Sequence, residues 1–125
     1  MRIIAGKALM DRNVPFGVSE NTLDGLIKSK ELIDQWHNKG RLSYAVTPRF
    51  AASSSYQQLD GCKKLLNDYP DLYLQTHLSE NHEEIEFVKK TYPTFPNYLS
   101  VYDEFDFLGC PSIFAHCIHV ENKEW

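Results

Sequence analysis

The sequence contains no long apolar run, and its hydrophobic stretches fall far short of the ~20 residues that a membrane-spanning helix needs. We therefore expect a protein that does not cross a membrane. Basic residues are not in excess either, since 13 Lys and Arg stand against 17 Asp and Glu, for a formal net charge of −4. Two pairs of lysines, 63–64 and 89–90, are isolated and form no basic stripe, so the sequence does not predict nucleic-acid binding.

Cysteine is scarce and is not arranged for disulfide or metal chemistry. The three cysteines are odd in number and show no C-x-x-C spacing, which indicates reduced side chains and a cytoplasmic protein. The N-terminus has one arginine and then a short apolar stretch that Gly6 and Lys7 interrupt, which is not the pattern of a signal peptide. A chain of 125 residues is one domain at most.

Short apolar strands alternate along the chain with amphipathic helices. The expected strands cover residues 2–9, 42–46, 72–75 and 112–115. The first expected helix covers residues 22–39 and ends at Gly40, and the second runs from the capping-box pair Ser54 and Gln57 to Pro70. A third expected helix is capped by Asn81 with Glu84, and a short fourth lies near residues 103–108. This alternation predicts an α/β fold with a parallel sheet and right-handed crossovers.

The residues best suited to chemistry follow the ends of successive predicted strands. The spacing from Thr47 to His77 is 30 residues and that from His77 to His116 is 39, and each distance suits a strand, a crossover helix and a strand. Active sites of α/β folds, most consistently of the (β/α)8 barrel, lie at the carboxyl ends of the strands. We therefore expect these residues to meet at one rim, listed in chain order as Arg49, Phe50, His77, Glu80 and His116.

The segment from Gln75 to Asn81 carries the most specific pattern. A histidine at a strand end is a good ligand for zinc or iron(II), and a glutamate three residues later can move protons for the attacking water. For His77 alone the alternative is a hydrogen-bonded loop histidine, and for Glu80 it is favourable electrostatics at a helix start. One histidine cannot hold a catalytic metal by itself.

The other rim residues have complementary chemistry. His116 could orient the attacking water or stabilise negative charge on a tetrahedral intermediate. The guanidinium of Arg49 could bind the acceptor edge of a planar heterocycle while the Phe50 ring stacks on its face. The alternative for this pair is a surface arginine beside a core phenylalanine.

The combination of motifs resembles the guanine deaminase family of the metal-dependent amidohydrolase superfamily. The motifs occur in the family's order and approximate spacing, as T-P-R-F-A at 47–51, Q-T-H-L-S-E-N at 75–81, Y-L-S-V-Y-D at 98–103 and F-A-H at 114–116. The H-x-x-E element is shared with many hydrolases of the superfamily, whereas T-P-R-F and Q-T-H-L-S-E-N are more specific to guanine deaminases. The resemblance extends over nearly the whole chain.

The resemblance implies a TIM (β/α)8 barrel that binds one zinc ion, with iron as the alternative, and hydrolyses guanine to xanthine and ammonia in purine catabolism. By resemblance, His77 is a zinc ligand from the fifth barrel strand that also contacts substrate. Glu80 shuttles protons and contacts substrate, Arg49 and Phe50 bind the purine ring, and His116 contacts the reacting water or substrate. Members of the family are typically homodimers.

The sequence departs from the family pattern at the metal site. The paired H-x-H ligands of the first strand and the aspartate of the eighth strand do not occur, so three of the four expected zinc ligands are absent. We therefore expect residues 1–125 to be a single partial barrel domain, truncated at both ends and covering approximately strands 3 to 6. Such a partial domain has unpaired edge strands and exposed apolar faces, so it should be marginal in stability, inactive alone and dependent on a complementing chain.

Two other functions remain open at this stage. One is another amidohydrolase that acts on a different nitrogen heterocycle, against which Arg49-Phe50 argues. The other is a non-catalytic or degenerate half-barrel.

Overall fold

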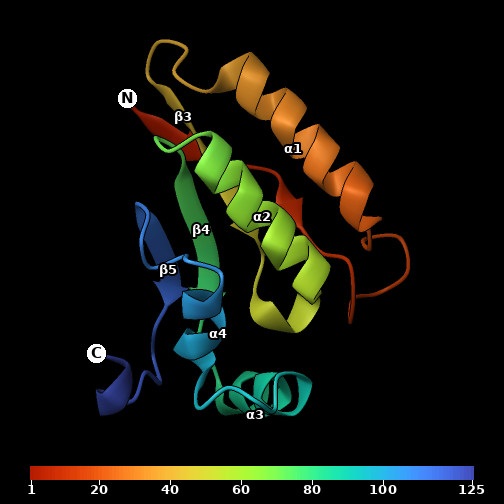
Figure 1. Cartoon of the computed structure of the whole chain (residues 1–125), viewed down its shortest axis with the longest axis vertical. Helices are drawn as coiled ribbons and strands as arrows, with labels where there is room; N and C mark the ends of the chain where they lie inside the picture. Colours follow the sequence, from red (N-terminus) through yellow and green to blue (C-terminus); the bar gives the residue numbers. More distant parts are fainter.

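Five parallel strands form a curled sheet in the computed structural model, which describes residues 1–125 (Figure 1). The main order is β1-β3-β4-β5, and the short β2 pairs with β3. The strands are β1 Ile3–Ala5, β2 Ala8–Leu9, β3 Leu42–Pro48, β4 Tyr73–Leu78 and β5 Ser112–His116. The helices are α1 Thr22–Trp36, α2 Tyr56–Asp68, α3 His82–Thr91 and α4 Tyr98–Glu104, with short 3-10 helices η1 Ala51–Ser53 and η2 Asn122–Glu124. The fold is a partial (β/α) barrel, as the sequence predicts.

The first predicted strand is divided into two short strands. Residues 3–5 pair with the start of β3 and residues 8–9 with its end, so both belong to one side of the same neighbour. Between them the chain approaches β3 closely, because a Cβ atom on Gly6 would lie only 1.7 Å from the carbonyl oxygen of Ala45. The prediction of one continuous strand over residues 2–9 is therefore wrong at Gly6 and Lys7.

Two predicted helix boundaries are displaced. The first helix ends at Trp36 rather than Lys39, because His37 turns into an extended conformation and its Nδ1 accepts a hydrogen bond from the Tyr44 amide at 3.1 Å. The second helix is capped by Ser55 rather than Ser54, and the Ser55 hydroxyl accepts from the amide at position 58.

The predicted cap of α3 is confirmed, whereas the predicted position of the last helix is wrong. Asn81 caps α3 as predicted, since its side chain accepts from the Glu84 amide at 2.9 Å. The short helix expected near residues 103–108 lies earlier, at Tyr98–Glu104, because Asn97 and Ser100 form a reciprocal capping box in front of it.

The sheet has one covered and one open face. The helices α1 and α2 pack against β3 on the covered face (Figure 1). Along β4 the side chains alternate, so that Leu74, Thr76 and Leu78 are buried while Gln75 and His77 are only partly buried. His77 therefore lies on the open face, which corresponds to the interior of a barrel.

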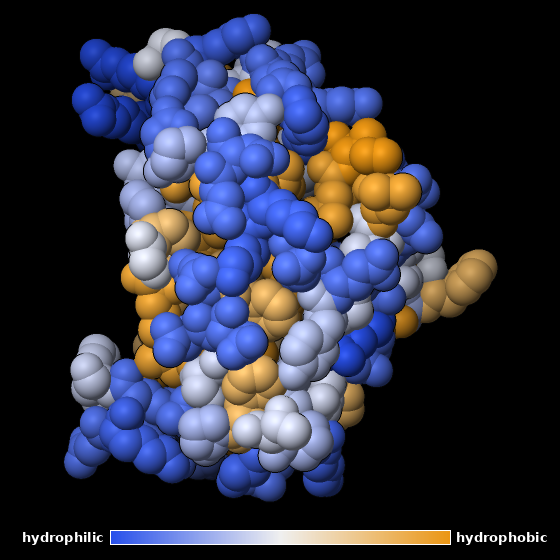
Figure 2. Space-filling view, in the orientation of Figure 1, coloured by the Kyte–Doolittle hydropathy of each residue, from blue (hydrophilic) through white to orange (hydrophobic).

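Large apolar side chains remain exposed at several places. On the sheet, Ile3, Ile4 and Ile113 are each more than 40% exposed, and on α1 Leu23 and Ile27 are also exposed. Figure 2 shows apolar residues gathered on the side of α1 and on the side of β5. Exposed apolar surfaces of this kind are typical of sites where other structural elements or partner chains pack. No helix has the length and apolar character needed to cross a membrane.

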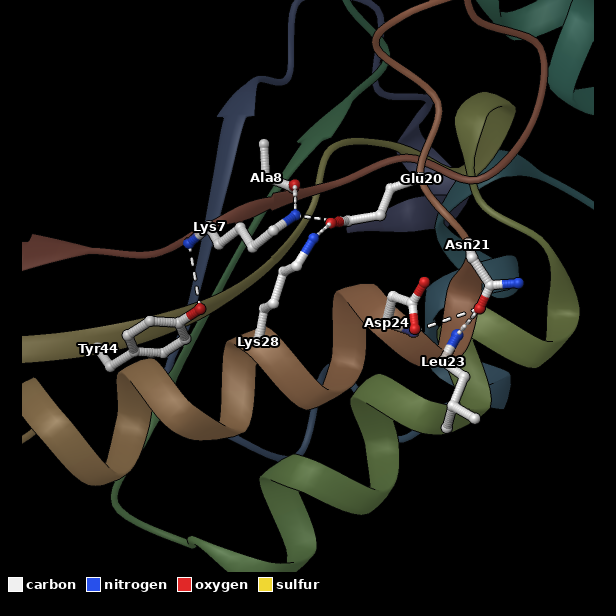
Figure 3. Close-up of polar contacts among 8 residues, drawn as sticks. All are labelled: Lys7, Ala8, Glu20, Asn21, Leu23, Asp24, Lys28 and Tyr44. Atoms are coloured by element: carbon white, nitrogen blue, oxygen red, sulfur yellow. Dashed lines mark hydrogen bonds and ion pairs between the residues drawn. The ribbon is translucent and has the colours of Figure 1, made fainter.

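The loop between β2 and α1 is held by charged and polar contacts (Figure 3). The Glu20 carboxylate binds the ammonium groups of Lys7 and of Lys28, the latter at 2.8 Å. Burial alone would raise the pKa of Glu20, but the two ammonium groups outweigh it and hold the pKa below its usual value. Asn21 then caps α1 by accepting hydrogen bonds from the amides of residues 23 and 24.

The same loop joins the starts of two helices through Asp11. Its carboxylate accepts hydrogen bonds from the Thr22 hydroxyl at 2.6 Å and from the Ser55 amide at 2.7 Å, and it also binds the Ser55 hydroxyl. The neighbouring Asn13 side chain donates to the Ala52 carbonyl at 2.8 Å. The loop therefore fixes the chain that follows β3, where Arg49 and Phe50 lie.

Candidate active site

The five predicted site residues line one recess at the carboxyl ends of β3, β4 and β5. We call it the site recess, and it has a cavity volume of about 330 Å³, which is in the range of small-molecule sites. It is lined by Arg49, Phe50, His77, Glu80, Asn81, Glu84 and His116. The parallel topology accounts for this convergence, since strands that run the same way end at the same edge. Asn81 and Glu84, which the sequence indicates only as capping residues, also contribute to the wall.

His77 is oriented by a carbonyl group from the neighbouring strand end. Its Nδ1 lies 2.7 Å from the carbonyl oxygen of Arg49, and its backbone amide donates to the same oxygen at 3.0 Å. Because a carbonyl oxygen can only accept, Nδ1 carries a proton, and in the neutral imidazole this tautomer leaves the lone pair on Nε2. This arrangement is typical of metal-binding histidines, whose second nitrogen donates to a carbonyl or carboxylate group.

Arg49 and Phe50 form the second wall of the site recess. The guanidinium carbon lies 5.2 Å from the centre of the Phe50 ring, a cation–π distance. That ring meets the His77 imidazole edge-on, with 6.5 Å between ring centres. A cation, an aromatic ring and a metal-binding type of imidazole are thus adjacent.

His116 and Glu80 form a further part of the rim. The imidazole rings of His116 and His77 lie 5.2 Å apart, and His116 Nε2 lies 3.6 Å from a carboxylate oxygen of Glu80. Both side chains are partly exposed, so they can still move and contact a ligand.

Left-handed backbone conformations shape this part of the rim. Ser79, His116 and Cys117 have φ angles of 50°, 73° and 54°, which non-glycine residues seldom adopt outside functional loops. The two loops are also bonded to each other, because the Ser79 carbonyl accepts from the amides of Ile118 and His119 at 3.2 and 3.1 Å. These turns end the regular strand alternation and bring Glu80 and His116 toward His77.

A buried tyrosine supports the site recess from α4. The Tyr102 hydroxyl lies within hydrogen-bond distance of groups on β4 and on the segment after β3. Burial raises the pKa of Tyr102, so the hydroxyl keeps its proton. In the sequence, Tyr102 stands out only as part of the Y-L-S-V-Y-D motif, because a tyrosine at a helical position indicates core packing and not a specific hydrogen bond.

The residues present fit one part of a metal centre. His77 lines the site recess, and in the neutral imidazole whose Nδ1 donates to the Arg49 carbonyl, Nε2 is the nitrogen that a zinc or iron(II) ion would bind. No group of three or more His, Cys, Asp or Glu side chains in the chain could hold a metal ion, and the three cysteines are free and lie outside the site recess. His77 therefore has the chemistry of one metal ligand, and the side chains around it do not form a complete ligand set.

Comparisons with known proteins show which proteins this chain is similar to. The model of the Amidohydrolase family matches residues 1–125. The chain is 48% identical to the guanine deaminase of Escherichia coli (strain K12) over 125 residues, which cover 100% of this chain and 28% of that protein. The structure of E. coli guanine deaminase superposes with a TM-score of 0.97 over 100% of this chain and 29% of its own. Guanine deaminase from C. acetobutylicum with bound guanine in the active site matches 95% of this chain and 29% of its own, with a TM-score of 0.91 and 38% identity.

Proposed function

This chain belongs to the amidohydrolase family, and we propose that it is the central part of a guanine deaminase, which hydrolyses guanine to xanthine and ammonia. The observation that carries the proposal is the convergence of Arg49, Phe50, His77, Glu80 and His116 in one recess at the strand ends. The similarity to guanine deaminases over the full length of the chain supports it. The chain spans about 28% of the length of these relatives, so the activity is proposed for the complete enzyme.

His77 holds a divalent metal ion through Nε2 in the proposed enzyme, with zinc as the expected metal and iron(II) as the alternative. The metal, when bound, supplies Lewis acidity for the hydrolysis. The hydrogen bond from Nδ1 to the Arg49 carbonyl fixes the tautomer and the rotation of the imidazole. The other ligands come from segments that this chain does not contain.

Arg49 and Phe50 bind the purine in the proposed enzyme. Guanine presents two acceptors on one edge, O6 and N7, which suit the paired N–H donors of a guanidinium group. The Phe50 ring offers an apolar surface for the planar base, and the guanidinium already lies 5.2 Å from that ring. This donor and ring pair favours guanine over a heterocycle with a donor edge.

Glu80 acts as the proton carrier in the proposed reaction. Its carboxylate takes a proton from the attacking water and delivers protons to the ring and to the leaving amino group, which departs as ammonia. His116, whose Nε2 lies 3.6 Å from Glu80, contacts the reacting water or the substrate and stabilises negative charge that develops on the attacked ring.

We further propose that residues 1–125 are a single partial barrel domain that corresponds approximately to strands 3 to 6. The exposed side chains of Ile3, Ile4 and Ile113 then contact neighbouring barrel elements in the complete enzyme. The isolated chain is expected to need these complementing segments. The complete enzyme is expected to be a cytoplasmic homodimer, and the free cysteines agree with a reducing compartment.

A hybrid enzyme tests the proposal. The 125 residues replace the matching segment of the E. coli guanine deaminase, and xanthine formation from guanine is measured with zinc present. We expect turnover by the hybrid enzyme and none by the purified 125-residue chain. Folded hybrid enzyme that binds zinc but does not convert guanine would contradict the proposal.

Substrate profiling of the same hybrid enzyme separates guanine from other ring substrates. Preference for cytosine or a triazine over guanine would favour a different amidohydrolase. The Arg49–Phe50 pair predicts preference for guanine.

A further inference from the structure

The hydroxyl group of Tyr102 connects three backbone segments beneath the site recess. Tyr102 is fully buried, and its hydroxyl donates a hydrogen bond to the His77 carbonyl at 2.7 Å. It accepts one from the Ala51 amide at 3.0 Å, and the Thr76 hydroxyl lies 3.2 Å away. Helix α4 therefore contacts both the strand that carries His77 and the turn that follows Arg49.

These contacts close a ring of hydrogen bonds around the His77 side chain. The imidazole Nδ1 donates to the Arg49 carbonyl, and the covalent backbone leads from Arg49 through Phe50 to the Ala51 amide. That amide donates to the Tyr102 hydroxyl, which donates back to the His77 carbonyl. Every link has a donor and an acceptor of fixed type, so the ring fixes the imidazole relative to its own backbone and to the Arg49 carbonyl.

The surroundings hold the hydroxyl in this role. The Tyr102 ring packs against Phe107 and Phe114, with ring centres 6.1 and 5.9 Å away. A ring packed in this way has little freedom to withdraw its hydroxyl.

We propose that Tyr102 is a positioning residue for the reaction, because its hydroxyl holds the His77 imidazole and the Arg49–Phe50 turn in one fixed relation. The role of His77 as a metal ligand rests on the proposed function. Tyr102 itself does not line the site recess, so it acts through the two groups that do.

Tyr98 provides a matched control one helical turn earlier. It is also a buried tyrosine of α4, 4% exposed, and its ring centre lies 5.6 Å from that of Tyr102. Its hydroxyl makes no hydrogen bond to the backbone of β4 or to the segment after β3, and its polar neighbours are the side chains of Tyr102 and Glu84. Tyr98→Phe and Tyr102→Phe therefore remove the same atom from the same helix, but only the second change opens the ring of hydrogen bonds.

The first measurement is the dissociation constant of the metal-free hybrid enzyme for zinc, determined by competition with a chelator. Loss of an outer contact to a metal-binding histidine weakens metal affinity by about 10-fold or more. We expect such a loss in Tyr102→Phe and a change of less than about 2-fold in Tyr98→Phe. Equal zinc affinity in the two variants would overturn the inference, whereas failure of the unmodified hybrid enzyme to convert guanine would overturn only the proposed function.

The second measurement is hydrogen exchange of the Ala51 amide in the unmodified hybrid enzyme, and it needs neither a variant nor activity. The inference predicts a slowly exchanging amide, and faster exchange after Tyr102→Phe but not after Tyr98→Phe. Exchange at the rate of an unprotected amide in the unmodified enzyme would overturn the inference, even if Tyr102→Phe does not fold.

Discussion

The carboxylate of Asp11 should be among the most important single polar groups for the stability of this chain. It accepts hydrogen bonds from the Ser55 amide at 2.7 Å and from the Thr22 hydroxyl at 2.6 Å, and it binds the Ser55 hydroxyl as well. Hydrogen bonds to charged groups contribute about 1.5–3 kcal/mol each. The two hydroxyls can turn toward water after Asp11→Ala, but the Ser55 amide at the start of α2 is fixed. We therefore expect the free energy of unfolding to fall by about 2–4 kcal/mol.

Urea unfolding of the hybrid enzyme, followed by far-ultraviolet circular dichroism, measures this loss. Asp68→Ala is the matched control, since Asp68 is an exposed residue of α2 that makes no ion pair, and its removal should change stability by less than about 0.5 kcal/mol. Asp11→Asn keeps an acceptor for the Ser55 amide and should retain a large part of the stability. If Asp11→Ala unfolds at the same urea concentration as Asp68→Ala, the reasoning about this carboxylate is wrong.

Two further changes have clear expected outcomes. The contacts with lysine outweigh burial and hold the pKa of Glu20 below its usual value near 4.5. The contribution of Glu20 to stability is therefore present above that pH and is lost as the pH falls through the lowered pKa. Thermal unfolding between pH 3 and pH 7 should show that Glu20→Gln removes this part of the acid dependence, which amounts to less than about 1 kcal/mol. Gly6→Ala places a Cβ 1.7 Å from the Ala45 carbonyl oxygen and should cost about 3 kcal/mol or more in urea unfolding, whereas Gly109→Ala, whose Cβ would meet its nearest atom at 3.5 Å, should be nearly neutral. Equal losses for the two glycine variants would show that the close approach of β1 to β3 is not a constraint.

The parallel topology and the convergence at the rim could be predicted from the sequence because both depend on local periodicity. Apolar strands alternate with capped amphipathic helices, and strand ends in such a fold share one edge. His77 and His116 are 39 residues apart in the chain, yet their rings lie 5.2 Å apart, as that topology requires. The Asn81 cap could also be predicted, because a cap is formed by residues three positions apart.

Features that depend on contacts between distant segments could not be predicted. The break at Gly6 arises from its approach to Ala45, and the early end of α1 is accompanied by a hydrogen bond from the Tyr44 amide to His37 Nδ1. Neither contact has a signature in local composition. The hydroxyl of Tyr102 donates to the His77 carbonyl 25 residues away, while the similar Tyr98 hydroxyl makes no such bond to the backbone of β4, and the sequence does not distinguish these two tyrosines.

The central claim, that this chain carries proton-transfer machinery of a guanine deaminase, is tested most directly by guanine turnover in the hybrid enzyme after Glu80→Gln. Glu83→Gln is the matched control, because this exposed glutamate in the first turn of α3 does not line the site recess. Loss of a proton carrier lowers kcat by about 100-fold to 10,000-fold, and we predict a loss of this size for Glu80→Gln with kcat nearly unchanged for Glu83→Gln. Full activity of folded Glu80→Gln hybrid enzyme, with zinc bound, would contradict the account.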